Sequence, residues 1–158
     1  PHTLSGGRVR ISSPIREWET GGPLDLNEGP EVLKNDTSVF IIYSCRESWL
    51  KEYRLGLLRL KSNESDPLKP ENWTKTGPVF QGTEEVHGTG HACFVKSPDG
   101  TEDWIIYHSK KTTDPGWNRD VRMQQFHWKS NGSPLFGKPI PAGIPLKRPS
   151  GEVAIEKN

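Results

Sequence analysis

The sequence predicts an all-β fold, namely part of a β-propeller with about two and a half blades, each a four-stranded antiparallel sheet. Three observations lead to this prediction. The chain repeats itself once at blade length, and it holds 16 Gly and 14 Pro among 158 residues, as expected where turns join many short strands. No segment of helical length keeps an apolar stripe at 3.6-residue spacing. A β-sandwich with two similar hairpins is the alternative.

The repeat is visible in two segments, Glu31–Cys45 and Cys93–Ser109. Lys96 follows Lys34 by 62 positions, whereas the tyrosines after the turn are 64 apart, because the second turn is two residues longer. Each segment contains a strand, a polar turn and a strand that is apolar on both faces, as in a sheet sandwiched between neighbours. The second turn, SPDG, has the residues that a tight hairpin requires.

Each unit continues with two further strand-like segments, which gives four strands per unit of about 62 residues. We therefore divide the chain into four parts. Residues 1–20 are expected to end a preceding blade, 21–82 to form one blade, 83–145 to form the next, and 146–158 to be a loosely held polar tail.

Composition narrows the function classes. The net charge is +1 and the Lys and Arg residues are scattered, so we expect neither a nucleic-acid nor a membrane partner. No apolar run approaches the roughly 18 residues of a spanning helix. Four Asn-x-Ser/Thr triplets favour a secreted, extracellular protein. Cys45 and Cys93 are expected as buried free thiols, with a bridge between blades as the alternative.

The inner strands of a propeller surround its axis, so residues at equivalent strand starts face one cavity. An offset of 62 aligns Glu28-Gly29 with Gly90-His91. A carboxylic acid and an imidazole converging there are candidates for chemistry. Glu28 is either a general acid tuned by its pocket or a polar turn residue. His91 is a metal ligand, a pocket wall or an ordinary turn histidine.

Two further residues have a functional and a structural interpretation. Arg122, in the strand-like VRMQQF, either offers its forked donors to a sugar hydroxyl or carboxylate or serves as a strut between blades. Trp49 either stacks on a sugar ring or covers a blade edge. The expected packing residues are Trp73, Trp104, Trp117 and Trp128.

The strings EGPEVL, GHACF, SPDGTEDWIIYH and VRMQQF, in this order, resemble glycoside hydrolase family 43. The resemblance runs from about residue 11 to residue 152. It implies a five-bladed propeller that removes arabinose or xylose from plant polysaccharides and requires no organic cofactor. The stretch from Ser44 to Gly56 is more similar to exo-acting members, so an α-L-arabinofuranosidase or a β-xylosidase is expected.

The resemblance also implies roles for the candidate residues. Glu28 matches the general acid of the family's EGP motif, in an inverting mechanism with two carboxyl groups roughly 6.5–9.5 Å apart. His91 matches a histidine that in many members helps to hold calcium or ordered water on the propeller axis, so it is a possible metal residue acting through water. Arg122 resembles the sugar-contacting arginine, and Trp49 an aromatic residue near the pocket rim.

The family's general base and its second aspartate match no residue here, so we expect this chain to carry only the acid side of the site. Loss of such a group costs about 10²–10⁴-fold, so the chain alone is expected to be inactive. We also expect two uncovered apolar sheet faces, which would pair with missing N-terminal blades or by self-association. A propeller that binds pentose polysaccharides without cutting them is the alternative function.

Overall fold

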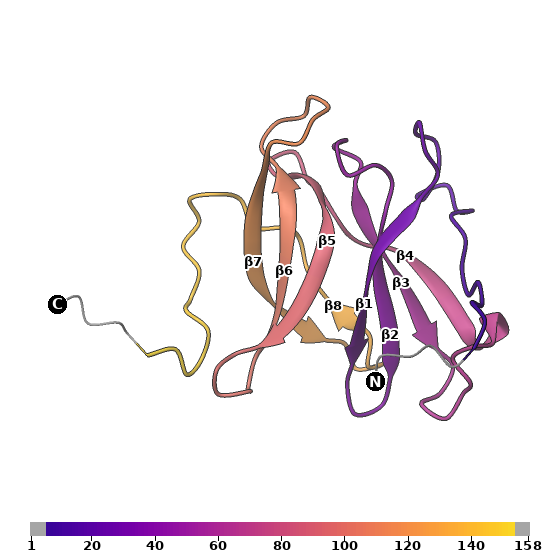
Figure 1. Ribbon diagram of the computed structural model, residues 1–158. Coiled ribbons are helices and arrows are strands. Elements are labelled where there is room, and N and C mark those ends of the chain that lie inside the picture. The colour runs from indigo at the N-terminus through magenta and orange to yellow at the C-terminus, as the bar shows by residue number, and fades with distance from the viewer. Residues whose placement is uncertain (1–5, 154–158) are drawn as a thin grey trace.

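The computed structural model describes residues 6–153 and contains two four-stranded antiparallel sheets. Figure 1 shows them side by side, with β1 of the first sheet next to β5 of the second. Both are simple up-and-down sheets, ordered β1-β2-β3-β4 and β5-β6-β7-β8. The all-β prediction and the four-stranded unit are confirmed.

The strands of each sheet follow one another along the chain. Those of the first sheet are β1 Asn27–Lys34, β2 Val39–Cys45, β3 Arg54–Leu60 and β4 Trp73–Gln81. A 3-10 turn, η1 Pro70–Asn72, precedes β4. Those of the second sheet are β5 His87–Lys96, β6 Asp103–Lys110, β7 Arg119–Trp128 and β8 Pro134–Leu135. No helix among residues 6–153 has the length and apolarity needed to cross a membrane.

The repeat predicted from the sequence is present in the two inner hairpins. Both inner strands end at the predicted lysines, Lys34 and Lys96, and the turns span residues 35–38 and 97–102, so the second is two residues longer. In the SPDG turn, the Asp99 carboxylate accepts hydrogen bonds from Ser97 Oγ and from the backbone N–H of Thr101, at 2.7 and 3.1 Å. This local side-chain bonding is the chemistry that the turn residues predicted.

The main hydrophobic core lies between the two sheets. It contains large side chains from both, among them Phe40 and Phe80 of the first sheet and Tyr107 and Phe126 of the second. The Phe80 and Tyr107 rings meet edge to face at 4.8 Å, a geometry that adds to the gain from burial alone. Packing of one sheet on the other therefore explains why one face of these strands is apolar.

The N-terminal segment differs from the expectation for a preceding blade. Residues 6–26 contain no strand, and they lie along the outer side of the first sheet (Figure 1). Ile11 and Trp18 pack there against Tyr43 and Leu58. The chain itself therefore covers one of the two sheet faces that were expected to be bare. The assignment of residues 1–20 to the end of a preceding blade stays a prediction.

A buried carboxylate fastens this segment to the sheet. The Glu19 side chain is fully buried, and Lys75 Nζ on β4 lies 2.8 Å from each of its oxygens. Its further donors are the Tyr43 hydroxyl, the Asn27 amide and two backbone N–H groups at residues 15 and 16. Burial raises the pKa of Glu19, but these hydrogen bonds outweigh it and leave the pKa below its usual value.

The outer face of the second sheet remains largely open. Val95 on β5 and Val121 and Met123 on β7 are exposed there, Val121 by 80%. The segment beyond β8 passes beside Met123 and then reaches the SPDG turn, where Ser150 bonds to Asp99 and Glu102. The expectation of a loosely held tail is therefore wrong at Ser150, because the turn carboxylates accept its N–H and O–H groups.

Both cysteines are free. Cys45 is buried at the end of β2, as expected, but Cys93 is exposed on β5. The expected burial of Cys93 is wrong because the β5 side chains alternate and the sheet surface at Cys93 is uncovered.

The substitution Glu19→Gln should lower the free energy of unfolding by about 3 kcal/mol, because it leaves the Lys75 ammonium without its anionic partner in a largely buried position. Urea unfolding followed by tryptophan fluorescence measures this change. Glu64→Gln, at an exposed loop position, is the control and should match the wild type. A Glu19→Gln protein within 0.5 kcal/mol (roughly the scale of a neutral surface change) of the wild type would contradict the anchoring role.

Candidate active site

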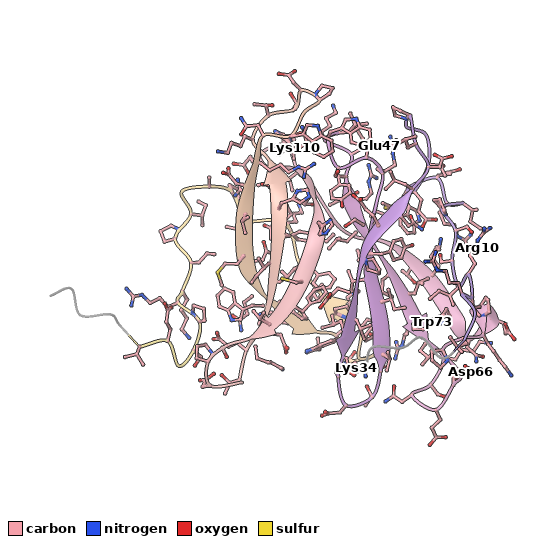
Figure 2. All side chains as sticks on the ribbon, in the orientation of Figure 1. Arg10, Lys34, Glu47, Asp66, Trp73 and Lys110 are labelled. Carbon is pink, nitrogen blue, oxygen red and sulfur yellow. The ribbon has the colours of Figure 1, made fainter. Side chains whose placement is uncertain are left out.

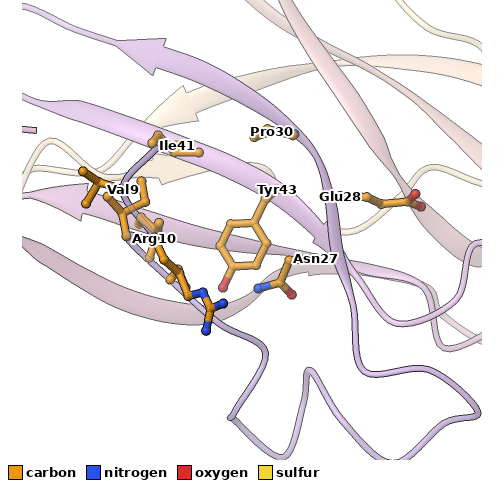
Figure 3. Close-up of a pocket in the computed structure, with 10 residues that line it drawn as sticks. Val9, Arg10, Asn27, Glu28, Pro30, Ile41 and Tyr43 are labelled. Carbon is orange, nitrogen blue, oxygen red and sulfur yellow. The ribbon is translucent and has the colours of Figure 1, made fainter. Parts of the chain in front are cut away.

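Glu28 lies at the start of β1, beside a bulge. It pairs with Ser44 on β2, and the register then shifts before Glu31 pairs with Ile42. Gly29 within the bulge has φ +53°, a conformation that glycine adopts without steric cost. Bulges redirect neighbouring side chains, and Figure 3 shows the Glu28 carboxylate on the opposite side of β1 from Tyr43 and Asn27.

A buried tyrosine holds the Glu28 carboxylate. The Tyr53 hydroxyl donates a 2.7 Å hydrogen bond to Glu28 Oε1, and the Tyr53 side chain is fully buried. Burial raises the pKa of Tyr53, and the hydrogen bond to Glu28 raises it further. The phenol therefore stays protonated and continues to donate its hydrogen bond to Glu28 throughout the physiological pH range.

Gly90 on β5 makes room for Tyr53. A Cβ atom built on Gly90 would lie 2.3 Å from the Tyr53 ring, closer than any real contact. Tyr53 lies in the loop between β2 and β3 of the first sheet, and Gly90 lies on β5 of the second, so this contact brings the two sheets together beside Glu28. The glycine of the GHACF string is thus required by packing.

The structure places His91 next to the Glu28 bulge. The His91 ring lies over Gly29, 3.1 Å from where a Cβ on that residue would be. Its backbone N–H donates to Ser44 Oγ at 2.7 Å, and its φ is +51°. Glu28 and His91 therefore occupy neighbouring inner positions of the two sheets, with the His91 side chain exposed.

His108 on β6 is a site residue that the sequence analysis did not select. It pairs in register with Gly90, and its ring stacks on Tyr53 at 5.2 Å with an interplanar angle of 4°. The His91 ring is 6.2 Å away. A signal for His108 was available, because the offset of 64 that aligns the two tyrosines also aligns Ser44 with His108.

The His108 ring is neutral near pH 7. Burial lowers its pKa to about 4, assisted by the nearby positive charge of Arg119 and by His91 and Lys110. Both ring nitrogens are buried, and neither has a hydrogen-bond partner within residues 6–153. The uncharged ring therefore packs face to face against Tyr53.

Arg122 is held away from the carboxylate. Its Nε donates to Ser109 Oγ and its Nη1 to the Ile140 carbonyl at 3.1 Å. No contact described for residues 6–153 joins Arg122 to Glu28 or His91. This arrangement suits the strut interpretation, and the sugar-contacting role of Arg122 stays a prediction.

Arg119, at the start of β7, is the guanidinium nearer the site. Its Nη2 donates to the Ser48 carbonyl at 3.0 Å, and its charge contributes to the lowered pKa of His108. Trp49 is half-buried in the loop between β2 and β3, with its ring 5.5 Å from that of Trp117. Trp117 is 66% exposed, so the expectation that it is a packing residue is wrong.

A cavity of about 360 Å³ lies on the other side of β1. It is bounded by residues 9–12 of the N-terminal segment and by residues of β1, β2 and β3, including Asn27 and Tyr43. Figure 3 shows that the Glu28 carboxylate points away from it. The acid is therefore directed to the inner rim between the sheets and not into this cavity.

The rim offers a carboxyl group, a phenol that orients it and an imidazole beside it. This set can donate a proton to a bound ligand. Within residues 6–153, no cluster of three or more His, Cys, Asp or Glu residues could hold a metal ion.

The thermal unfolding temperature should fall as the pH is lowered from 6.5 towards 4. His108 in the unfolded chain binds a proton near its ordinary pKa of 6.5, whereas in the folded protein it binds one only near 4, so acid favours the unfolded state. His108→Phe keeps a ring against Tyr53 without a titrating nitrogen and should flatten this dependence. His127→Gln, at an exposed position, is the control. An unchanged slope in His108→Phe would refute the buried neutral imidazole.

Comparison with known proteins identifies close relatives. The sequence profile described as Glycosyl hydrolases family 43 matches residues 2–134. An extracellular exo-α-(1→5)-L-arabinofuranosidase of Streptomyces avermitilis is 36% identical over 91% of this chain, and α-L-arabinofuranosidase 43 of Humicola insolens is 33% identical over 90%. The chain spans 31% of the length of each of these relatives.

Solved structures agree with these matches. The α-L-arabinofuranosidase of Lactobacillus brevis superposes with a TM-score of 0.84 at 34% identity, over 92% of this chain and 46% of that one. A thermostable family-43 glycoside hydrolase superposes with a TM-score of 0.77 at 26% identity, over 95% and 47%. The two sheets are thus adjacent blades of a larger propeller. The profile match and the sequence identities together show that the chain belongs to glycosyl hydrolases family 43.

Proposed function

We propose that this chain forms the acid side of an inverting, exo-acting glycoside hydrolase that removes terminal pentoses from arabinose- or xylose-containing polysaccharides. The observation that supports this most directly is the Glu28 carboxyl group, held by Tyr53 at the inner rim beside His91. The same arrangement without turnover would make a pentose-binding module, which the experiments below distinguish.

Glu28 acts as the general acid. Its proton passes to the glycosidic oxygen while the bond from that oxygen to the anomeric carbon breaks, so the leaving group departs as a neutral alcohol. A second carboxylate, on the opposite face of the sugar, takes a proton from water, and the water oxygen bonds to the anomeric carbon with inversion. Tyr53 binds Oε1 of Glu28, which leaves Oε2 to carry the transferred proton.

The base carboxylate is expected from the part of the family domain that this chain does not span. We therefore propose that turnover requires those blades in place. The exposed Val121 and Met123 on the outer face of the second sheet supply an apolar surface that further blades, or a second copy of the chain, would cover.

The relatives named as α-L-arabinofuranosidases favour an α-L-arabinofuranoside over a β-xyloside as the substrate. One of them is named as extracellular, and together with the four glycosylation triplets this supports secretion. Two carboxyl groups suffice for the reaction, so no cofactor is required for the proton transfer.

Calcium on the propeller axis is a separate proposal. Calcium takes six to eight oxygen ligands, whereas the residue of this chain placed at the rim for such an ion is a histidine, His91. The His91 ring is exposed and lies beside Gly29, and we propose that it acts on such an ion through a bound water. The residues described here do not form a calcium site by themselves.

Glu28→Gln should reduce the hydrolysis of arabino-oligosaccharides by about 10²–10⁴-fold, because an amide accepts the Tyr53 hydrogen bond but donates no proton to the leaving oxygen. The assay uses this chain combined with a polypeptide that supplies the N-terminal part of the family domain. A smaller loss is expected on 4-nitrophenyl α-L-arabinofuranoside, whose leaving group departs without protonation.

Glu31→Gln, three residues further along β1, makes the same chemical change away from the rim and should leave the rate unaltered. If Glu28→Gln cleaves oligosaccharides at the wild-type rate, Glu28 is not the general acid. Oligosaccharide binding without turnover by the wild-type assembly would identify the binding module instead.

Tyr53→Phe should lower kcat about 10-fold with little change in KM, because the Glu28 carboxyl group loses the hydrogen bond that orients it. Tyr107→Phe is the matched control, since it removes another buried phenol, hydrogen-bonded to Gln124 at 3.0 Å and not to Glu28. Equal rates for Tyr53→Phe and Tyr107→Phe in the same assay would show that the phenol has no positioning role.

A further inference from the structure

Three side chains form an aromatic rim at one end of the two sheets: Trp49, Trp117 and Arg119. The Trp49 and Trp117 rings are 5.5 Å apart with an interplanar angle of 50°. The Arg119 guanidinium lies 4.5 Å from the centre of the Trp117 ring, within cation–π range. Trp49 comes from the loop after β2 and Trp117 from the loop after β6, so the rim joins both blades.

One hydrogen bond joins these two loops, and a second holds the loop after β6 to the end of its own strand. The Gly116 N–H donates to the Trp49 carbonyl at 2.9 Å, and Lys110 Nζ donates to the Gly116 carbonyl at 2.8 Å. Lys110 is only 3% exposed. Figure 2 shows Glu47 and Lys110, which lie at the starts of the two loops, at the same end of the molecule. The Trp117 indole is therefore exposed yet fixed in place, which lowers the entropy cost of binding a ligand.

The aromatic rim lies close to Glu28, the proposed general acid. Trp49 and Tyr53 are four residues apart in one loop, and a fully extended chain of that length spans at most about 14 Å. Tyr53 bonds directly to Glu28. Arg119 also links the rim to the site, since its Nη2 binds the Ser48 carbonyl in that same loop. A ligand whose glycosidic oxygen lies at Glu28 is therefore within reach of the rim.

The surroundings of Trp117 indicate the class of ligand. The residues before it in the loop, 111–116, are Lys-Thr-Thr-Asp-Pro-Gly, and most of them are exposed and polar. One exposed indole in a polar loop, flanked by a half-buried tryptophan and an arginine, offers too small an apolar area for a stable protein interface. It suits a ligand with an apolar C–H face and hydroxyl groups around it, which describes a pentose ring.

We propose that Trp117, supported by Trp49 and Arg119, is a subsite that binds a pentose of an arabinose- or xylose-containing chain on the leaving-group side of Glu28. We assign the leaving-group side because a general acid contacts the leaving-group oxygen. The loop that carries Trp49 also carries Tyr53, which binds that acid. This inference rests on the proposed function and adds the part of the substrate that the acid does not touch.

The test uses this chain with 15N-labelled indoles, titrated with linear α-1,5-linked arabinohexaose and, separately, with xylohexaose. The Trp117 and Trp49 indole signals should shift with one or both oligosaccharides, while that of the buried Trp104 should not. Trp117→Ala should weaken binding about 2- to 10-fold, the range expected for loss of one ring contact. Trp117→Phe, which keeps an aromatic face, should retain most of the affinity.

Leu68→Ala, another exposed apolar position, is the matched control and should bind as the wild type does. The inference is overturned if neither oligosaccharide shifts the Trp117 signal, or if Trp117→Ala binds as tightly as the wild type. This titration measures binding and not turnover. If hydrolysis does not depend on Glu28, the proposed reaction is rejected but the subsite is not. If the Trp117 signal does not shift with either oligosaccharide, the subsite is rejected but the proposed reaction is not.

Discussion

The contact between the Tyr53 ring and Gly90 determines the rest of the site. It is the point where the loop between β2 and β3 inserts a fully buried side chain against the inner strand of the second sheet. Any side chain at position 90 would push the sheets apart there. The same ring carries the hydroxyl that holds Glu28 and provides the surface on which His108 stacks. One packing contact thus sets the position of the acid, the neutral imidazole and, through the register of β5, His91.

The molecule uses two kinds of attachment with different physical consequences. Between the sheets, large apolar and aromatic side chains are buried against each other, and the gain scales with the area removed from water. On the outer side of the first sheet, a segment without regular structure is held by the buried carboxylate of Glu19 and its donors. Such a polar anchor contributes specificity of position more than stability, because desolvation offsets much of the attraction between the charges.

The backbone at the inner rim, beside Glu28 and His91, departs from the conformation of a regular strand. Gly29 and His91 both have positive φ, and both lie at irregularities in the pairing of an inner strand. Positive φ is uncommon for a residue with a side chain, so the His91 conformation is maintained by its surroundings, including the hydrogen bond to Ser44. Bulges of this kind direct side chains out of the regular alternation of a strand. They explain why an acid and an imidazole from two sheets come to neighbouring positions.

The sequence by itself determined the architecture and half of the site. Turn residues, strands apolar on both faces and an offset of 62 are local properties, so they predicted two four-stranded units and placed Glu28 opposite Gly90 and His91. The tertiary structure determined the features of the site that the spacing of residues along the sequence does not specify. Tyr53 and His108 join the site through packing between sheets, Arg119 lies nearer to it than Arg122, and Trp117 is exposed. Residues 6–26 cover a sheet face that the pattern left bare. These outcomes depend on contacts between residues distant in the chain, whose formation is set by the volume and the hydrogen-bonding groups available after the sheets have packed.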